Sequence, residues 1–567
     1  MIILRYFDSI NIFCFIFNLK NLFKMQFSKK YKIYIILSIL PVLLILSGSI
    51  LKNSLGEYYL NLYDPAYVYL INSLNLAQMS GYGVGHIDHP GTPVQVTGSV
   101  ILIIYHFLSH TSLDIVDDVF NRPEQYLFIL NKGFILIVAA ALFTLGLLVF
   151  KFAGNILISI LFQLSPFISN VILYGMVDVS PDNFLILSSL LFSAMLIIYL
   201  YKDREVSELS FKIILLISII SGFGLATKLN FIPVLFIPLI LISKIRLKLT
   251  YVFFTLIFFF IFVFPAIENY QYFVGWIKNL FIHNGIYGTG ADNIVNFPQF
   301  FRNIVKIITI NYFFGIIYFF SISTLIYYYL KWNKTNSSVN TFKPLIEVRV
   351  LTALLISFTI QIIIVAKHYH PYSQKYMIPS LMLSLTALFV CIRIHFYFFK
   401  NRRENLIYLI MIILLLIWNA TQFYSLNQYL RFQKLESTVI EDYIKDNYSQ
   451  NFIISDLESS DYEKSMAFNI FYSGSQTDKY MNLLSEKFTS NIFYSGWADQ
   501  FIYISDTVKI RNNILKEEKI IIQLSKFASI DKVRAKLIEL CKADNIFIDK
   551  KIENNNGESV YEAYIFK

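Results

Sequence analysis

Long apolar runs, separated by short segments that carry the charged residues, make up most of the chain. A helix that crosses the hydrocarbon core of a bilayer needs about 20 predominantly apolar residues. About eleven runs are candidates on this criterion, so the pattern predicts a mainly α polytopic membrane protein. The candidate spans are residues 32–52, 126–150, 154–173, 183–201, 211–227, 230–243, 250–266, 303–330, 349–366, 376–393 and 405–424.

Basic residues gather in every second segment between these spans. Lys and Arg are retained in the short loops on the cytoplasmic side of a membrane, so residues 1–31, which end in a basic flank, are expected to be cytoplasmic or interfacial. The alternation then places residues 53–124 outside, as a large first external loop. The basic clusters that follow it on the inside are Lys151, Lys202–Arg204, Lys244–Lys248, Lys331–Arg349 and Lys400–Arg403.

The apolar stretch 94–109 needs separate treatment, because one more crossing would move every later basic cluster to the outside. It is short for a span and is bounded by Pro93, His106 and His110. A helix that lies along the outer face of the membrane fits these features better. We therefore predict that residues 94–109 do not cross.

The last 140 or so residues have a different pattern. Residues 428–567 combine a helical signal ("STVIEDYIKDNY") with short strand-like runs ("NFIIS", "FIYIS", "KIIIQL", "NIFID" and "AYIF"). This mixture predicts a small α/β domain, and the span count places it outside the membrane. No Gly or Pro run separates it from the last span, so that helix is expected to continue into it. The transmembrane domain is thus assigned to residues 32–427.

Composition agrees with a membrane protein, since 56% of the residues are hydrophobic and only 15% are charged. Soluble domains carry about 25% charged residues. The net charge of +10 resides in the loops of the membrane part, and no basic stripe with interleaved aromatic residues indicates nucleic-acid binding. Cys14, Cys391 and Cys541 lie far apart, so neither a disulfide framework nor a zinc site is indicated.

The first external loop concentrates ionisable residues in "DPAYVYLINSLNLAQMSGYGVGHIDHPGTPVQ". Such groups next to a membrane are often functional. Asp64 precedes Pro65 and a helical stretch, so it is either a catalytic carboxylate or a helix N-cap. His86, Asp88 and His89 could bind a metal ion, although their spacing matches no common ligand motif.

Later external segments carry a second set of candidates. Asp178 and Asp182 are either site residues or caps of the next span, and Lys228 is either an anion ligand or a lysine that reaches the interface. The segment "KHYHPYSQKYMIP" offers a cationic, hydrogen-bonding surface suited to a phosphate group. Its candidates are Lys367, His368, His370, Lys375 and Tyr376. His283 opens "HNGIYGTG", which is either an anion-binding or a mobile loop.

In their order along the chain, these residues resemble the GT-C superfamily of membrane glycosyltransferases, which includes protein O-mannosyltransferases and lipid A aminoarabinose transferases. The resemblance covers about residues 32–400, and residues 428–567 match only in placement. Many members have two adjacent acids in the first loop, whereas Pro65 follows Asp64 here, so the resemblance leaves the base and any metal open. The matching elements are Asp64, His89-Pro90, Asp182, Thr227-Lys228 and a late Lys367, Tyr376, Pro379 segment.

The resemblance implies that a sugar is transferred, with inversion, from a polyprenyl-monophosphate donor to an acceptor at the outer face of the membrane. Such attack needs a base for the acceptor proton and cations for the departing phosphate. Asp64 is the expected base, and His89 and Asp182 are expected to orient substrate or a basic partner. The expected phosphate ligands are Lys228, Lys367, His368, His370, Lys375 and Tyr376, and the further cavity candidates are His86, Asp88, Asp178 and His283.

The expected partners are the lipid-linked donor, a glycan, lipid or protein acceptor, and membrane lipids, but no nucleic acid. No cofactor is firmly implied, and a divalent cation stays open. The expected location is the bacterial cytoplasmic membrane, with the site facing outward. Two alternatives are a flippase or transporter of lipid-linked sugars and a surface-glycan polymerase or ligase. Transporters place ionisable groups near mid-span in repeated halves, whereas the acids here lie at loop ends.

Overall fold

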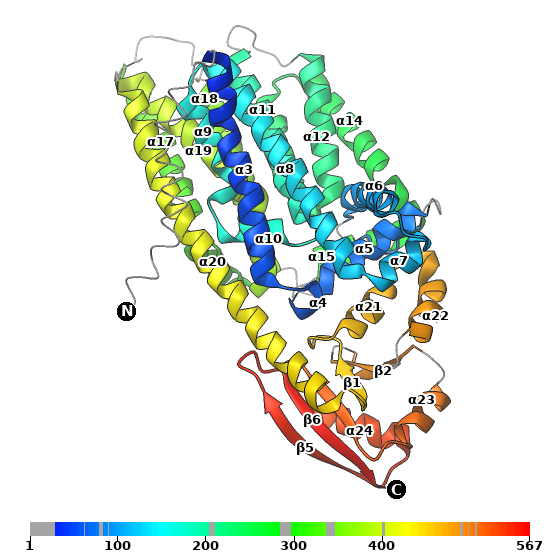
Figure 1. Ribbon diagram of the computed structural model, residues 1–567. Coiled ribbons are helices and arrows are strands. Elements are labelled where there is room, and N and C mark those ends of the chain that lie inside the picture. Colours follow the sequence, from blue (N-terminus) through cyan, green and yellow to red (C-terminus); the bar gives the residue numbers. More distant parts are fainter. Residues whose placement is uncertain are drawn as a thin grey trace.

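The computed structural model describes residues 29–61, 63–78, 83–88, 90–202, 210–283, 296–335, 346–399, 403–487, 492–496, 498–504 and 507–566. Within this part of the chain, nine helices are long and apolar enough to cross a membrane, and a bent pair adds a tenth candidate. They form a bundle whose long helices run side by side (Figure 1). The fold class expected for the chain, a polytopic helical protein with a small C-terminal α/β domain, is therefore confirmed.

The helices before the middle of the chain are α3 (Lys29–Leu55), α4 (Tyr58–Asn61), α5 (Tyr63–Ala77), α6 (Thr92–Ser109), α7 (Ile115–Asn121), α8 (Pro123–Ala153), α9 (Ile156–Gln163), α10 (Asn170–Val177), α11 (Asp182–Lys202), α12 (Phe211–Thr227) and α13 (Ile232–Leu241). They continue as α14 (Ile245–Val263), α15 (Tyr270–Ile282), α16 (Phe297–Ile310), α17 (Tyr312–Thr335), α18 (Ile346–Lys367), α19 (Ile378–Phe399) and α20 (Glu404–Tyr448). Short 3-10 helices η2 (Ser165–Phe167), η3 (Leu229–Phe231), η4 (Phe264–Asn269) and η6 (Pro371–Met377) join some of them.

Three predicted spans differ from the observed helices. The span expected at 154–173 is bent by 68° between Ile156–Phe167 and Asn170–Val177. The span expected at 250–266 runs on through η4 and α15 as far as Ile282. The prediction of one helix over 303–330 is wrong, because the chain turns at Asn311 between α16 and α17.

Opposite polarities on its two faces explain why α16 is a separate helix. Phe297, Phe301 and Val305 are exposed, whereas Asn303 is buried and donates to the Ala366 carbonyl at 2.9 Å. Asn311 donates from its side chain to Gln374 at 2.5 Å, which anchors the turn to η6. A helix with this distribution is suited to an interface rather than to the hydrocarbon core.

The stretch expected to lie along the outer face forms α6. By length and composition it is among the nine apolar helices of the described chain, but it runs across the direction of α3, α8 and α12 (Figure 1). Gly98 packs so closely on α5 that a Cβ there would meet the Ser73 hydroxyl at 2.3 Å. This orientation agrees better with a helix that lies beside the ends of the bundle than with a span. The position of α6 relative to a membrane stays a prediction.

The C-terminal region contains one six-stranded mixed sheet in the order β3-β2-β1-β4-β6-β5. The five expected strand runs are all found, and β2 is a strand that the pattern did not indicate. Parallel pairing joins β1 to β2 and to β4, and the other pairs are antiparallel. The elements are β1 (Phe452–Asp456), α21 (Tyr462–Ile470), η7 (Gly474–Gln476), α22 (Thr477–Lys487), β2 (Ile492–Ser495), β3 (Gln500–Tyr503), α23 (Thr507–Ile514), β4 (Ile520–Leu524), α24 (Ile530–Cys541), β5 (Asn545–Glu553) and β6 (Ser559–Phe566).

Helix α20 carries the chain from the bundle into this domain as one helix of 45 residues, as the missing Gly or Pro linker predicts. It passes without interruption through the boundary expected near residue 427. In the C-terminal domain, α21 packs against α5, and α22 lies next to α7 (Figure 1). The C-terminal domain therefore contacts the segment in which the sequence concentrates its ionisable residues.

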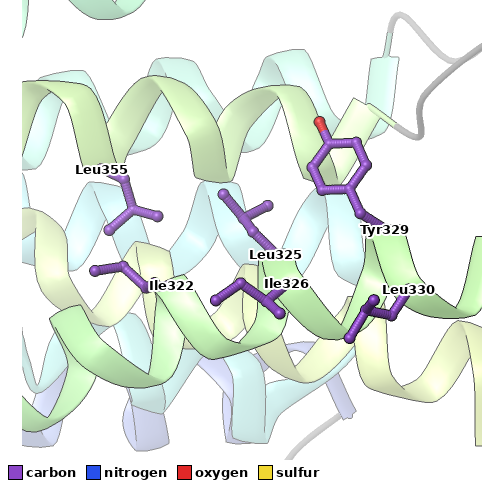
Figure 2. Close-up of a pocket in the computed structure, with 6 residues that line it drawn as sticks. All are labelled: Ile322, Leu325, Ile326, Tyr329, Leu330 and Leu355. Atoms are coloured by element: carbon purple, nitrogen blue, oxygen red, sulfur yellow. The ribbon is translucent and has the colours of Figure 1, made fainter.

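An apolar groove of about 430 Å3 lies between α17 and α18. Figure 2 shows its lining residues, which are Ile322, Leu325, Ile326, Tyr329 and Leu330 of α17 and Leu355 of α18. Leu355 precedes Lys367 by twelve residues of continuous helix, or about 18 Å. The groove is therefore apolar and lies at a distance from the ionisable cluster at the helix ends.

Candidate active site

A buried ion pair joins the start of α11 to the segment between α12 and η3. The Lys228 ammonium lies 2.7 Å from the Asp182 carboxylate, and both side chains are at most 2% exposed. Asp182 is the first residue of α11, whereas Lys228 is extended (φ −162°, ψ 135°) between α12 and η3. Burying two charges is favourable only when they are paired in good geometry, so each residue holds the other in place.

The segment at Lys228 also holds the end of the loop that carries His86 and Asp88. Pro90 forms an antiparallel bridge with Lys228, and the Gly91 amide donates to the Ala226 carbonyl at 3.1 Å. Gly91 has φ 72°, and a Cβ there would meet the Tyr69 hydroxyl at 2.4 Å, so glycine is required at this contact. His89 lies outside the described residues, but its neighbour Pro90 is thus fixed beside Lys228.

Asp64 lies immediately before the regular part of α5. Its backbone is extended (φ −115°, ψ 119°) immediately before Pro65, which is the conformation of a helix N-cap. A capping side chain would accept from the amides that follow, yet the hydrogen bonds of the described residues include none to this carboxylate. The Asp64 side chain is exposed, whereas the five residues after Pro65 are buried. A carboxylate that is left accessible in this way can meet a substrate.

Several charges act on the Asp64 carboxyl. Surrounding protein atoms desolvate it and raise its pKa, despite its access to solvent, and Asp88 adds to this effect. His86 and, less strongly, Lys375 oppose the rise. A carboxyl whose pKa is raised in this way is a better proton acceptor than an ordinary aspartate.

Asp178 lies in the turn between α10 and α11 and is buried. Burial raises the pKa of its carboxyl to about 7, with further contributions from Asp182 and Asp64 and an opposing one from Lys375. Asp178 therefore binds a proton more readily near neutral pH than an ordinary aspartate does. Because Asp182 is neutralised by Lys228, an arriving phosphate meets less negative charge than the number of acids indicates.

The segment after α18 brings aromatic and cationic groups to this cluster. The Lys228 ammonium lies 5.1 Å from the centroid of the Tyr376 ring, and the His370 ring packs edge-on against Tyr376 at 5.6 Å. Burial and the charges of Lys375, His368 and Lys228 lower the pKa of His370 to about 4. His370 is therefore a neutral hydrogen-bonding group at pH 7, while Lys375 is the cation of η6.

Lys367 and His368, which were also predicted to bind phosphate, instead contact α15. The Lys367 ammonium donates to the carbonyls of Leu280 at 2.7 Å and Phe281 at 2.9 Å. His368 Nε2 lies 3.0 Å from the same Leu280 carbonyl, and His283 ends α15. These three residues gather at the carboxyl end of α15, where cations are favourable. Among the described residues, the hydrogen bonds of Lys367 do not reach the Lys228–Asp182 pair.

We expect Lys367→Ala to act mainly through α15. Two charge-assisted hydrogen bonds to its carboxyl end are lost, each with a net contribution of about 1.5–3 kcal/mol. Hydrogen exchange of α15 should therefore increase, while the rate of any chemical step changes much less than in a Lys228 variant. Exchange mass spectrometry of the purified protein measures this, and unchanged protection of α15 would contradict the assignment.

His86 and Asp88 both lie near Asp64. His86 is buried between two tyrosine rings, at 5.6 Å from Tyr69 and 5.8 Å from Tyr472, with both rings edge-on. Asp88 also lies close to Tyr272 of α15. Tyr69 and Tyr472 were not indicated by the sequence, and Tyr472 belongs to the C-terminal domain, so no local signal points to it.

The described residues hold no group of three or more His, Cys, Asp or Glu side chains arranged to bind a metal ion. Among the acids of the cluster, Asp182 is paired with Lys228 at 2.7 Å.

The thermal stability of the Asp64→Asn variant provides a test of this environment. The folded-state pKa of Asp64 lies above that of the unfolded chain, so the folded protein binds this proton more tightly. The resulting stabilisation is fully present below the unfolded pKa and is lost as the pH rises through the folded pKa. The variant has no titrating group at this position and avoids the loss, so it should unfold at a higher temperature than the wild type at pH 7 and at a similar one near pH 4. An equal difference at both pH values would contradict the raised pKa.

No family model matches the chain, and no curated protein matches it in sequence. Among solved structures, it is similar to the crystal structure of ArnT from Cupriavidus metallidurans bound to undecaprenyl phosphate. The two share 9% identity over 92% of this chain and 97% of that chain, with a TM-score of 0.45. The function of the present chain therefore has to be argued from its own side chains.

Proposed function

We propose that the chain is a GT-C-type glycosyltransferase, which moves a sugar from a polyprenyl-monophosphate donor to an acceptor at the outer face of the membrane. One observation carries the proposal. The accessible Asp64 carboxylate, whose pKa is raised, lies in one cluster with the cations Lys228 and Lys375. A base and an anion-binding surface are the two elements that the transfer needs.

The reaction would be a single displacement. The acceptor hydroxyl oxygen attacks the anomeric carbon, the bond from this carbon to the phosphate oxygen breaks, and the polyprenyl phosphate leaves with the bonding electrons. Asp64 takes the proton of the hydroxyl group, which restores the charge balance. Because attack and departure occur on opposite faces of the carbon, the configuration inverts.

Lys228 and Lys375 would stabilise the charge that develops on the departing phosphate. Lys228 is already desolvated, and burial lowers the pKa of its ammonium while Asp182 opposes this effect. In a poorly hydrated site, such a charge acts more strongly than it does in water. Neutral His370 and the Tyr376 hydroxyl are further candidates for hydrogen bonds to the phosphate or the sugar.

The location of the charged groups supports an enzyme more than a transporter. Asp64, Asp178 and Lys228 lie in turns or at helix ends, whereas transport pathways place such groups near mid-span. By the alternation of basic loops, this end of the bundle faces outward. In a bacterium, the enzyme would then reside in the cytoplasmic membrane and act on a glycan, lipid or protein acceptor outside the cytoplasm.

The test is an assay of the purified protein with a panel of polyprenyl-monophosphate sugars and hydroxyl-bearing acceptors. Mass spectrometry should detect released polyprenyl phosphate with wild-type protein but not with Asp64→Asn. A parallel series with diphosphate-linked donors separates the polymerase or ligase alternative. Turnover restricted to diphosphate donors, or movement of donor across vesicles without release of phosphate, would overturn the proposal.

A further inference from the structure

The C-terminal domain is fastened to the loop that carries His86. The Asn72 side chain of α5 donates to the Tyr472 carbonyl at 3.0 Å and accepts from the Gly85 amide at 2.8 Å. Asn75, one turn later, donates to the carbonyls of Gly83 at 2.6 Å and Ser473 at 2.7 Å. Two asparagines of one helix thus hold both segments together.

The two backbones also touch directly. A Cβ on Gly85 would lie 2.2 Å from the Gly474 nitrogen and 2.5 Å from the Tyr472 carbonyl oxygen. Gly474 has φ 62°, which favours glycine, and a Cβ there would meet the Gly85 backbone at 3.0 Å. Glycine on both sides permits an approach that no other residue would allow. The contact between these two segments, which lie far apart in the chain, is therefore close and specific.

This contact brings Tyr472 next to His86. Their rings meet edge-on at 5.8 Å with an interplanar angle of 90°, and the Tyr69 ring also packs edge-on against the imidazole at 5.6 Å. Edge-on aromatic pairs of this kind fix ring orientation. Burial, with smaller contributions from the charges of Asp64 and Asp88, raises the pKa of Tyr472 to about 12. Tyr472 therefore also lies within electrostatic reach of the expected base.

We propose that the C-terminal domain completes the active site, in which Tyr472 positions His86 and His86 in turn holds Asp64 ready as the base. The inference rests on the proposed function, and it gives the C-terminal domain a part in catalysis through the position of His86. Tyr472 is a positioning residue, because it acts through the histidine.

The electrostatics around Asp64 make the proposal testable. His86 is the largest opposing influence on the raised pKa of Asp64, and it exceeds that of Lys375. Asp88, two residues from His86, acts in the opposite direction. The titratable and charged groups that face Asp64 from the surrounding elements are His86, Asp88, Lys375, Asp178, Tyr69 and Tyr472.

The experiment measures kcat/KM against pH with the polyprenyl-monophosphate sugar that supports turnover. The acid limb of this profile reports protonation of the base in the free enzyme. His86→Gln removes an influence that lowers the pKa of Asp64, so the limb should move to higher pH. Asp88→Asn removes an influence that raises it, so the limb should move to lower pH. Below the limb, His86→Gln should turn over about tenfold more slowly than wild type, as for a shift of one pKa unit.

Variants of Tyr472 test the part played by the C-terminal domain. Tyr472→Ala should move the limb in the same direction as His86→Gln, whereas Tyr472→Phe keeps the ring and should keep the wild-type limb. His106→Gln is the matched control, because His106 lies 3.4 Å from a different carboxylate, Asp118. Only a role through Asp64 predicts that the acid limb moves in opposite directions in His86→Gln and Asp88→Asn. The same role predicts that Tyr472→Phe keeps the wild-type limb. Unmoved limbs in His86→Gln and Tyr472→Ala would overturn the inference while leaving the proposed function intact.

A second measurement does not depend on turnover. The thermal midpoint at pH 7 is compared for His86→Gln in the wild-type and Asp64→Asn backgrounds, which isolates the coupling of the two residues. The midpoint should fall more in the wild-type background than in the Asp64→Asn background, because only a carboxylate needs the imidazole. Coupling without sugar transfer would overturn the proposed function alone, and absence of coupling would overturn the positioning of Asp64 by His86.

Discussion

Replacement of Asp64 with asparagine is expected to lower the rate of sugar transfer by about 10²- to 10⁴-fold, the usual contribution of a positioned general base. An amide has the size of the carboxylate but does not accept the acceptor proton. Because asparagine caps a helix as well as aspartate does, the start of α5 should be unaffected. Turnover is measured as released polyprenyl phosphate under saturating donor.

Asp114 provides the matched control for this substitution. Its side chain caps α7 by accepting from the amides of Val116 and Asp117, which is the role that a local interpretation would also give to Asp64. Asp114→Asn should therefore retain wild-type turnover. If Asp64→Asn behaves in the same way, Asp64 is a cap and the base lies elsewhere.

Features of the fold that depend on local composition could be predicted from the sequence. Crossing a bilayer requires an apolar helix whatever its neighbours are, so the long helices follow from hydropathy. The strand runs around Ile454, Ile522 and Ile546 are similarly visible, because short β-rich segments alternate there with helical ones. The continuous α20 follows from the absence of helix-breaking residues after Trp418.

The break between α16 and α17 could not be predicted in this way. Residues on both sides of Asn311 are apolar, so an average over the stretch resembles one span. The turn depends on Asn303 and Asn311, which find partners on α18 and η6. Those partners are more than 60 residues distant, and only the tertiary packing identifies them.

The candidate site shows the same division. Sequence order selected Asp64, Asp182 and Lys228 as external ionisable residues, and the structure brings them into one cluster. Sequence order did not separate Lys228 from Lys367, since both follow apolar helices. Their partners separate them, because Lys228 faces a carboxylate, whereas Lys367 faces the carbonyls at the end of α15.

The second large effect is expected for Lys228. Loss of one preorganised charge from a developing oxyanion typically costs on the order of 3 kcal/mol, or about 100-fold in rate, and Lys228→Ala should show a fall of this size. The same change leaves the buried Asp182 carboxylate without its partner, which costs about 3–5 kcal/mol of stability. A loss of activity in Lys228→Ala alone therefore has two explanations, the missing cation and the lower stability of the fold.

A double variant, Lys228→Met with Asp182→Asn, separates the effect of the missing cation from the effect on stability. Replacing both members of a buried ion pair by uncharged groups of similar size is often close to neutral for stability, so the double variant should unfold near the wild-type temperature. It still lacks the cation, so its turnover should stay about 100-fold below that of the wild type. Lys367→Ala serves as the control for the loss of a lysine at the same end of the bundle. A double variant that is folded and fully active would show that neither Lys228 nor Asp182 takes part in the transfer, and Lys375 would then be the remaining cation of the cluster to test.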